Sequence, residues 1–354
     1  AMAAWKGLVF EETVPYNGEA VDESLRDASG YHLQNAFYLA GGPYSITDIA
    51  KPSLDQIKEM IMEYGALSID YYASAEDPAY NAETHAWFNS EKKSPDHAVT
   101  VVGWDDSFSR ENFLVGNRPQ ADGAWLVKNS WGLDWGDNGY FWLSYEDQSM
   151  ISSAFYQVEA ADNYQHNYQY DTAGWVFSMA TQPDSTTAYA SNVFTSEQAE
   201  QLEAVSFYTT DSDTRYEIDV YVNLTDPENP VSGTKAMQTL TGIKSYSGYY
   251  TIPLLDAVPL QEGETFSIVV KLANARYPYP IAAEGTVLPE SYGEPKYLGN
   301  GGESYISTDG NQWIDIAGEF EHSDGYRYFF TNVCIKAFTN PISTVSFSQQ
   351  EGPI

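Results

Sequence analysis

Two short stretches contain the residues of this sequence whose types and order could support catalysis. Residues 96–104 begin with an aspartate and His97 and continue as an apolar run, and residues 127–132 contain Asn129. A histidine at the start of one strand and an asparagine at the end of a later strand can be adjacent in space. The asparagine side-chain oxygen then accepts a hydrogen bond from one imidazole nitrogen, which fixes the tautomer and leaves the other nitrogen to face a nucleophile.

The residues around both stretches predict the strands that would position them. Residues 98–104 are rich in β-branched side chains and end at a Gly-Trp pair, and residues 124–128 run into a glycine-rich turn at Asn129. The polar segment 105–122 between them contains Asn, Gly, Pro and Asp, so we expect an inserted surface hairpin or loop there. Residues 85–88 are expected to pack beneath the sheet rather than line a cleft.

These stretches resemble the histidine and asparagine motifs of the papain-like cysteine peptidases. Three motifs follow one another in the family's order, namely Asp-His-Ala-Val at 96–99, Lys-Asn-Ser-Trp-Gly at 128–132 and Trp-Gly-Asp-Asn-Gly-Tyr-Phe at 135–141. The resemblance covers residues 1–160 and implies hydrolysis of peptide bonds through a thiolate and an acyl-enzyme.

The resemblance also implies a role for each residue of the candidate site. His97 would be the general base and acid, Asn129 its orienter, and Trp131 the side chain that shields their hydrogen bond from water. Asp96 would support the imidazolium by its charge. The structural alternatives are a strand-start histidine, an asparagine that caps a strand end, a core tryptophan and a solvated loop carboxylate; the order of the three motifs favours the catalytic roles.

The family's nucleophile is absent from its expected place. In the family it is a cysteine at a helix N-terminus upstream of the histidine, whereas the single cysteine here is Cys334, far downstream. Its alternating strand, 332–337, predicts a buried and inert thiol. Residues 1–5 look like the uncapped end of a helix, and residues 11–16 resemble the segment that follows the nucleophile. We therefore expect this chain to be inactive alone and to work with an upstream segment or chain that carries the cysteine.

A helix followed by a strand is predicted before the histidine stretch. Ser53 and Gln56 form a capping box, Gly65 ends the helix, and residues 66–72 alternate as a strand. The apolar face recurs every three or four residues, at Ile57, Met60, Ile61 and Tyr64. This order also resembles the papain-like fold. Residues 21–50 are expected to be mixed and rich in loops.

Beyond residue 160 the sequence pattern changes to short alternating runs separated by turns such as 226–230 and 309–311. The runs are 190–194, 203–208, 216–223, 248–253, 265–272, 305–307 and 332–338. This pattern, without an evident helix, predicts an antiparallel β-sandwich. The half looks similar to the lectin-like domain that follows the catalytic domain in several bacterial papain-like peptidases.

The predicted architecture is therefore an α+β papain-like catalytic domain joined to an all-β antiparallel sandwich. The catalytic domain would occupy residues 1–160, without its nucleophile-bearing segment, the sandwich residues 161–340, and a tail or linker residues 341–354.

Composition limits the partners and the location. The chain has 17 Lys and Arg against 50 Asp and Glu, a formal net charge of −33, which argues against nucleic acid or an anionic membrane as a partner. No apolar run is long enough to cross a membrane. We expect a secreted or cell-surface, extracellular protein without a cofactor. Carboxylates at 211–213 and 309–311 could contact calcium, although neither completes a ligand loop, so metal binding stays open.

A function of another class stays open as well. The chain could be a non-catalytic surface protein on a degenerate peptidase fold, whose sandwich binds a glycan or a protein through Trp175, Tyr277, Tyr279 and Trp313. Core filling is the alternative role of these aromatic residues. In the enzymatic interpretation the partners are a peptide or protein substrate, the cysteine-bearing segment and a glycan at the sandwich.

Overall fold

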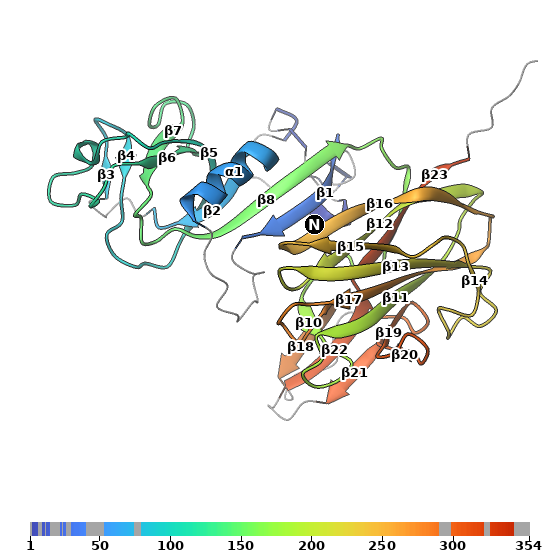
Figure 1. Cartoon of the computed structure of the whole chain (residues 1–354). Coiled ribbons are helices and arrows are strands. Elements are labelled where there is room, and N and C mark those ends of the chain that lie inside the picture. The colour runs from blue at the N-terminus through green and yellow to red at the C-terminus, as the bar shows by residue number, and fades with distance from the viewer. Residues whose placement is uncertain are drawn as a thin grey trace, which may run out of the picture. The chain divides into compact units, whose positions relative to one another are not determined.

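The computed structural model describes residues 2–5, 9–10, 12–14, 22, 24–25, 30–39, 53–73, 79–289, 299–321 and 326–342. The chain divides into two units (Figure 1). The His97 unit comprises Leu33–Val158 with Tyr246–Gly248, and the all-β unit comprises Ala1–His32, Glu159–Ser245 and Tyr249–Ile354. The expectations for residues 15–16 and 343–354 fall outside the described residues.

The His97 unit consists of one sheet and a helix, α1. Across the sheet the strand order is β3-β4-β7-β6-β5-β2-β8-β1. Strands β4 and β7 pair in parallel, whereas β2–β5, β5–β6 and β6–β7 are antiparallel. The bounds are β1 Tyr31–Tyr38, α1 Leu54–Tyr64, β2 Leu67–Tyr71, β3 Tyr80–Asn81, β4 Ala86–Trp87, β5 His97–Asp105, β6 Ala124–Lys128, β7 Tyr140–Ser144 and β8 Ile151–Ala160.

Helix α1 forms as its sequence predicts. The Ser53 hydroxyl accepts from the Gln56 backbone N–H and the Gln56 side chain accepts from the Ser53 N–H, which completes the capping box. Its apolar side chains Ile57, Met60 and Ile61 are buried. The expectation that residues 21–50 are rich in loops is wrong for residues 31–38, because they form β1, whose partners lie far away in the sequence.

The segment between β5 and β6, predicted to be a surface hairpin or loop, is attached to the unit by buried side chains. It contains a short 3₁₀-helix, Arg110–Asn112, and it forms no hairpin of its own. Phe113 is 1% exposed and meets Phe88 and Phe108 edge to face. Trp87 and Phe88 are buried too, in agreement with the packing role predicted for residues 85–88. Two apolar side chains in a polar segment, Phe108 and Phe113, thus attach the insertion to the sheet.

The all-β unit is built from antiparallel strands, and its described residues from 159 to 342 contain no helix. One sheet has the order β14-β13-β17-β11-β19-β20 with β15 beside β13, a second β10-β18-β22-β21, and a third series is β16-β12-β23-β9. The bounds are β9 His166–Tyr168, β10 Phe177–Met179, β11 Thr187–Thr195, β12 Glu200–Thr209, β13 Thr214–Val222, β14 Thr234–Lys235, β15 Leu240–Lys244, β16 Ser247–Leu260, β17 Thr265–Ala273, β18 Ile281–Pro289, β19 Ser304–Ser307, β20 Ile314–Asp315, β21 Gly318–Glu321, β22 Tyr326–Val333 and β23 Ile335–Pro341. The two predicted parts, an α+β unit and an all-β antiparallel unit, are both present.

Candidate active site

The antiparallel pairing of β5 and β6 brings the two candidate residues together. Thr100 pairs with Lys128, so the start of β5 lies beside the end of β6. His97 is the first residue of β5, and Asn129 directly follows β6. As a result, His97 Nε2 lies 2.8 Å from Asn129 Oδ1.

This contact defines the tautomer of the imidazole. The amide oxygen of Asn129 can only accept, so Nε2 of His97 carries the hydrogen and donates it. The described residues offer Nδ1 of His97 no hydrogen-bond partner, and the ring is only half-buried. The nitrogen that remains is therefore free to take a proton from another group.

Asn129 is itself held by its own backbone and by the next residue. Its backbone N–H donates to Gly139 O at 2.9 Å, and the Ser130 N–H donates to Asn129 Oδ1 at 2.8 Å. The side chain is 8% exposed. These contacts orient the amide so that its oxygen, rather than its nitrogen, faces His97.

Aromatic rings cover the pair. Trp131 stacks on His97 with ring centroids 4.8 Å apart and an interplanar angle of 16°. Trp135 meets Trp131 edge to face at 4.8 Å, and Tyr80 stacks on Trp135 at 5.2 Å. Trp131 is still 41% exposed, so it covers one face of the imidazole while its own outer surface stays in contact with water.

The turn that carries these tryptophans depends on glycine. Gly136 has φ +62°, and a Cβ there would lie 2.4 Å from Tyr140 O. The Gly139 N–H donates to Trp135 O at 2.8 Å, and the Asp137 N–H donates to Tyr140 O at 2.8 Å. The turn is thus tight, and only glycine fits at position 136 without a shift of the backbone.

Tyr71 was not predicted as part of the site. It ends β2 opposite His97, and the two ring centroids are 5.8 Å apart. Its hydroxyl is buried, and burial, together with the charges of Asp147 and Asp96, raises the pKa of Tyr71 far above its ordinary value. The alternation of β2 is the signal that could have found it, since the buried face of that strand ends at Tyr71.

Asp96 makes backbone contacts that were not anticipated. Its Oδ1 accepts from the Ala73 N–H at 2.7 Å, and its own N–H donates to Tyr71 O at 3.1 Å. Asp96 therefore fastens the end of β2 to the start of β5. Its effect on the charge of His97 stays a prediction.

Cys334 does not offer a nucleophile to this site. It belongs to the all-β unit and is 2% exposed. Burial, and the nearby carboxylate of Asp171, raise the pKa of its thiol well above the ordinary value. An attacking sulfur must be a thiolate, and burial disfavours that form. The thiol is buried as predicted, but residues 332–337 do not form one alternating strand, because the chain bends at Cys334 between β22 and β23.

The residues suspected of calcium contact use their carboxylates within the protein. Asp309 accepts from the Asn311 and Gln312 N–H groups, and Asp211 accepts from the Arg276 and Tyr277 N–H groups. In the described part of the chain, no three His, Cys, Asp or Glu side chains are grouped to hold a metal ion. No described helix is long and apolar enough to span a membrane.

Of the four suspected binding aromatics, Tyr279 is exposed, whereas Trp175, Tyr277 and Trp313 are half-buried. Trp175 donates from its ring nitrogen to Ser178 Oγ at 3.1 Å and is half-buried. Tyr279 is 44% exposed, and its ring centroid lies 5.3 Å from that of Tyr277. Tyr279 also lines a largely apolar cavity of about 460 Å³ in the all-β unit, together with Phe177, Ile306, Ile314, Tyr328 and Phe330.

Comparison with known families gives the class of each part. Residues 1–161 match the papain family of cysteine proteases, and residues 167–339 match the lectin-like domain. The chain thus contains a papain-family cysteine protease region followed by a lectin-like domain, as the motifs and the strand pattern predict.

Two solved structures resemble the chain over nearly its whole length. A clostridial cysteine protease, Cwp84, after propeptide cleavage has 29% sequence identity and a TM-score of 0.74, over 96% of this chain and 80% of that one. A structure of the cysteine protease and lectin-like domains of Cwp84, a surface layer associated protein of Clostridium difficile, has 27% identity and a TM-score of 0.71, over 96% and 71%.

Curated relatives resemble a smaller share of the chain. Cathepsin L1 of Drosophila melanogaster is 29% identical over 151 residues, 42% of this chain and 35% of that protein. Pro-cathepsin H of Mus musculus is 30% identical over 139 residues, 38% of this chain and 35% of that protein. The chain spans about a third of the length of these two relatives.

Proposed function

We propose that this chain supplies the histidine and asparagine of a cysteine endopeptidase site. The single observation that carries the proposal is the 2.8 Å contact between His97 Nε2 and Asn129 Oδ1. It holds the imidazole with Nδ1 free, which is the state in which a histidine accepts a proton from a thiol. The residues proposed for the peptidase part are 1–160, for the sandwich 161–340, and for the tail 341–354.

The nucleophilic cysteine is proposed to come from a segment upstream of residue 1 or from another chain. Its thiol proton passes to Nδ1 of His97, and the thiolate attacks the peptide carbonyl. His97 then gives that proton to the leaving amine, and the acyl-enzyme is released by water with His97 as the base. The thiolate and the imidazolium stabilise each other, and Trp131 keeps water from the hydrogen bond between His97 and Asn129.

Hydrolysis of a fluorogenic peptide tests this proposal. The chain alone is compared with the same chain joined to its natural preceding sequence, and that sequence is also prepared with its cysteine changed to alanine. We expect turnover only in the joined form with the cysteine present. Full activity of residues 1–354 alone would refute the role of an external cysteine.

The proposed substrate is a peptide or protein outside the cell. The description of Cwp84 as surface layer associated supports a cell-surface location, and the net charge of −33 suits an extracellular protein. Peptide specificity is proposed to depend partly on the segment that brings the cysteine, because that segment would form one wall of the cleft.

A second candidate function is ligand binding by the lectin-like domain. The observation that favours it is the cavity of about 460 Å³ beside Tyr279, since aromatic faces pack well against sugar rings and apolar side chains. A glycan array probed with the whole chain tests it. Binding should be lost in Tyr279→Ala and kept in Tyr326→Ala, a tyrosine that is 46% exposed and does not line the cavity; no binding by the unchanged chain would count against a glycan ligand.

A further inference from the structure

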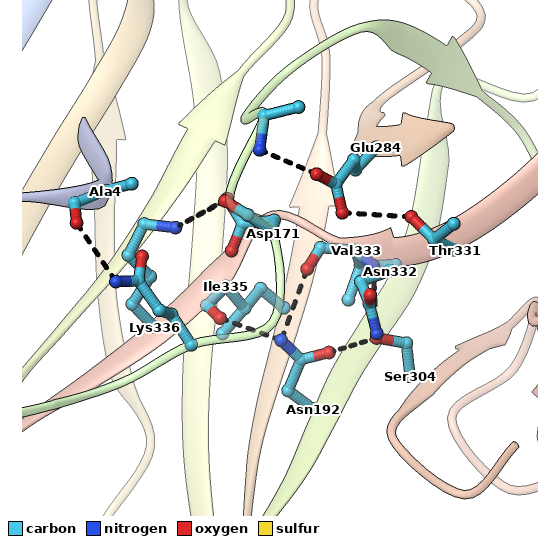
Figure 2. Close-up of polar contacts among 12 residues, drawn as sticks. Ala4, Asp171, Asn192, Glu284, Ser304, Thr331, Asn332, Val333, Ile335 and Lys336 are labelled. Carbon is cyan, nitrogen blue, oxygen red and sulfur yellow. Dashed lines mark hydrogen bonds and ion pairs between the residues drawn. The ribbon is translucent and has the colours of Figure 1, made fainter. Parts of the chain in front are cut away.

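A lysine and an aspartate form a fully buried pair in the all-β unit. Lys336 lies in β23, and Asp171 lies just after β9; both side chains are 0% exposed. Lys336 Nζ is 2.5 Å from Asp171 Oδ2 and 3.4 Å from the Asp171 backbone oxygen (Figure 2). The peptidase proposal makes no use of either residue.

If this contact is an ion pair, few other hydrogen bonds stabilise its two charges. Charges removed from water need further hydrogen bonds if the pair is to be stable. Among the described residues, Lys336 Nζ donates to Asp171 alone, and the buried Oδ1 of Asp171 has no hydrogen-bond partner. Burial raises the pKa of the Asp171 carboxyl, with a smaller contribution from the charge of Glu284, while Lys336 lowers it.

The surroundings keep the pair dry and hold a second carboxylate nearby. Tyr249 is 1% exposed, and its hydroxyl lies close enough to feel the charge of Asp171. Glu284 accepts from the Ala173 N–H at 2.6 Å and from Thr331 Oγ1 at 3.0 Å (Figure 2). Glu284 is itself half-buried, whereas the Lys336 and Asp171 side chains are fully buried, so little water can reach an amide bond formed between them.

We propose that Lys336 and Asp171 are joined by an isopeptide bond between Nζ and Cγ. One C–O bond beyond Oδ2, the carboxyl carbon lies no more than about 3.7 Å from Nζ, close to attack distance. A proton moves from the ammonium to the carboxylate along the 2.5 Å contact, which leaves a neutral amine and a neutral acid. Nζ then attacks Cγ, a proton from the nitrogen passes to the leaving hydroxyl, the C–O bond breaks, and water departs.

The bond closes a large part of the domain into a ring. Its two residues are 165 positions apart, and they tie the segment after β9 to β23. A crosslink of this kind restricts the unfolded chain. An extracellular protein that has no disulfide framework would gain resistance to unfolding and to proteolysis.

Mass spectrometry of the full chain under denaturing conditions tests the proposal. We expect a mass one water molecule below that of the sequence and, after trypsin, a branched peptide that contains both Lys336 and Asp171. The full sequence mass would overturn the proposal. So would the loss of water from a single unbranched peptide, which is the mark of cyclisation within one segment.

Two lysine variants provide the matched comparison. Lys336→Met should show the full mass of its sequence, whereas Lys271→Met should remain one water lighter. Lys271 is a suitable control because its Nζ lies 2.9 Å from Glu217 Oε1, but both side chains are partly exposed. Loss of the branched peptide in the Lys271 variant would contradict the assignment to Lys336, and the mass of the unchanged chain decides the question even where Lys336→Met fails to fold.

Discussion

At the scale of residues, the imidazole of His97 is useful to a peptidase only in one tautomer. Hydrogen on Nε2 leaves Nδ1 as the base, and Asn129 imposes that arrangement because its oxygen only accepts. The sequence alone was enough to nominate both residues, since the three motifs stand in order. It did not predict Tyr71 beneath the ring or the contact of Asp96 with Ala73, because both follow from strand pairing over long stretches of chain.

Asn129→Ala should weaken catalysis in the cysteine-bearing enzyme without removing it. A hydrogen bond to a charged group is worth about 1.5–3 kcal/mol, so we expect kcat/KM to fall roughly 10- to 150-fold. KM should change little, because the amide touches the imidazole and not the substrate. Asn129→Asp, which retains an acceptor oxygen, should recover part of the loss; an unchanged kcat/KM in Asn129→Ala would show that the amide does not orient the ring.

Trp131→Ala should expose the hydrogen bond between His97 and Asn129 to water. We expect faster exchange of the His97 Nε2 hydrogen, measured by NMR on the chain alone, because the stacked ring at 4.8 Å is lost. Trp131→Phe keeps an aromatic face and should give an intermediate rate. Equal exchange rates in all three proteins would contradict the shielding role.

At the scale of elements, the sequence predicted best those elements whose determining residues lie close together in the chain. Helix α1 formed with its capping box because the cap and the apolar face lie within a dozen residues. Strand β1 and the buried Phe113 were missed, since the burial of each depends on partners distant in sequence. The turn after Asn129 was predicted in part. Its glycines indicate a turn from the sequence alone, whereas the residues that they contact could not be predicted.

Two glycines of this turn allow the destabilisation caused by backbone strain to be measured apart from that caused by steric overlap. Gly132 has φ +88° and open space around its missing Cβ, whereas Gly136 has φ +62° and Tyr140 O at 2.4 Å from that position. Gly132→Ala should destabilise the protein by about 1 kcal/mol through strain alone, and Gly136→Ala by more than that. Urea unfolding measures both; equal losses would show that the turn relaxes around the new methyl group.

At the scale of the whole molecule, a second buried carboxylate links strands of the all-β unit. Glu200 accepts from His166 Nδ1, Thr339 Oγ1 and Ser196 Oγ and also contacts the Tyr168 hydroxyl. Burial alone would raise the pKa of Glu200, but these hydrogen bonds outweigh it and lower the pKa. A chain with so many carboxylates is sensitive to acid wherever one of them is held in its charged form.

Glu200 should therefore contribute stability that acid removes. Its contribution is complete above the unfolded-state pKa of about 4.3 and is lost as the pH falls through the lower folded-state pKa. We expect Glu200→Gln to lower the melting temperature at neutral pH. The difference in melting temperature between the variant and the unchanged protein should become smaller below about pH 4. The matched variant Glu217→Gln, at a partly exposed site, should change little; a gap that stays constant with pH would contradict the role of the carboxylate.

The central claim is that His97 is the base of a cysteine peptidase whose nucleophile lies outside residues 1–354. The most direct measurement compares kcat/KM for a fluorogenic peptide in the cysteine-bearing enzyme, its His97→Ala variant and a His85→Asn control, since His85 sits at φ +54°, where asparagine is tolerated. The account predicts a loss of about 10²- to 10⁴-fold for His97→Ala and a change of a few-fold at most for His85→Asn. A His97→Ala variant that stays folded and retains activity within tenfold of the unchanged enzyme would contradict it.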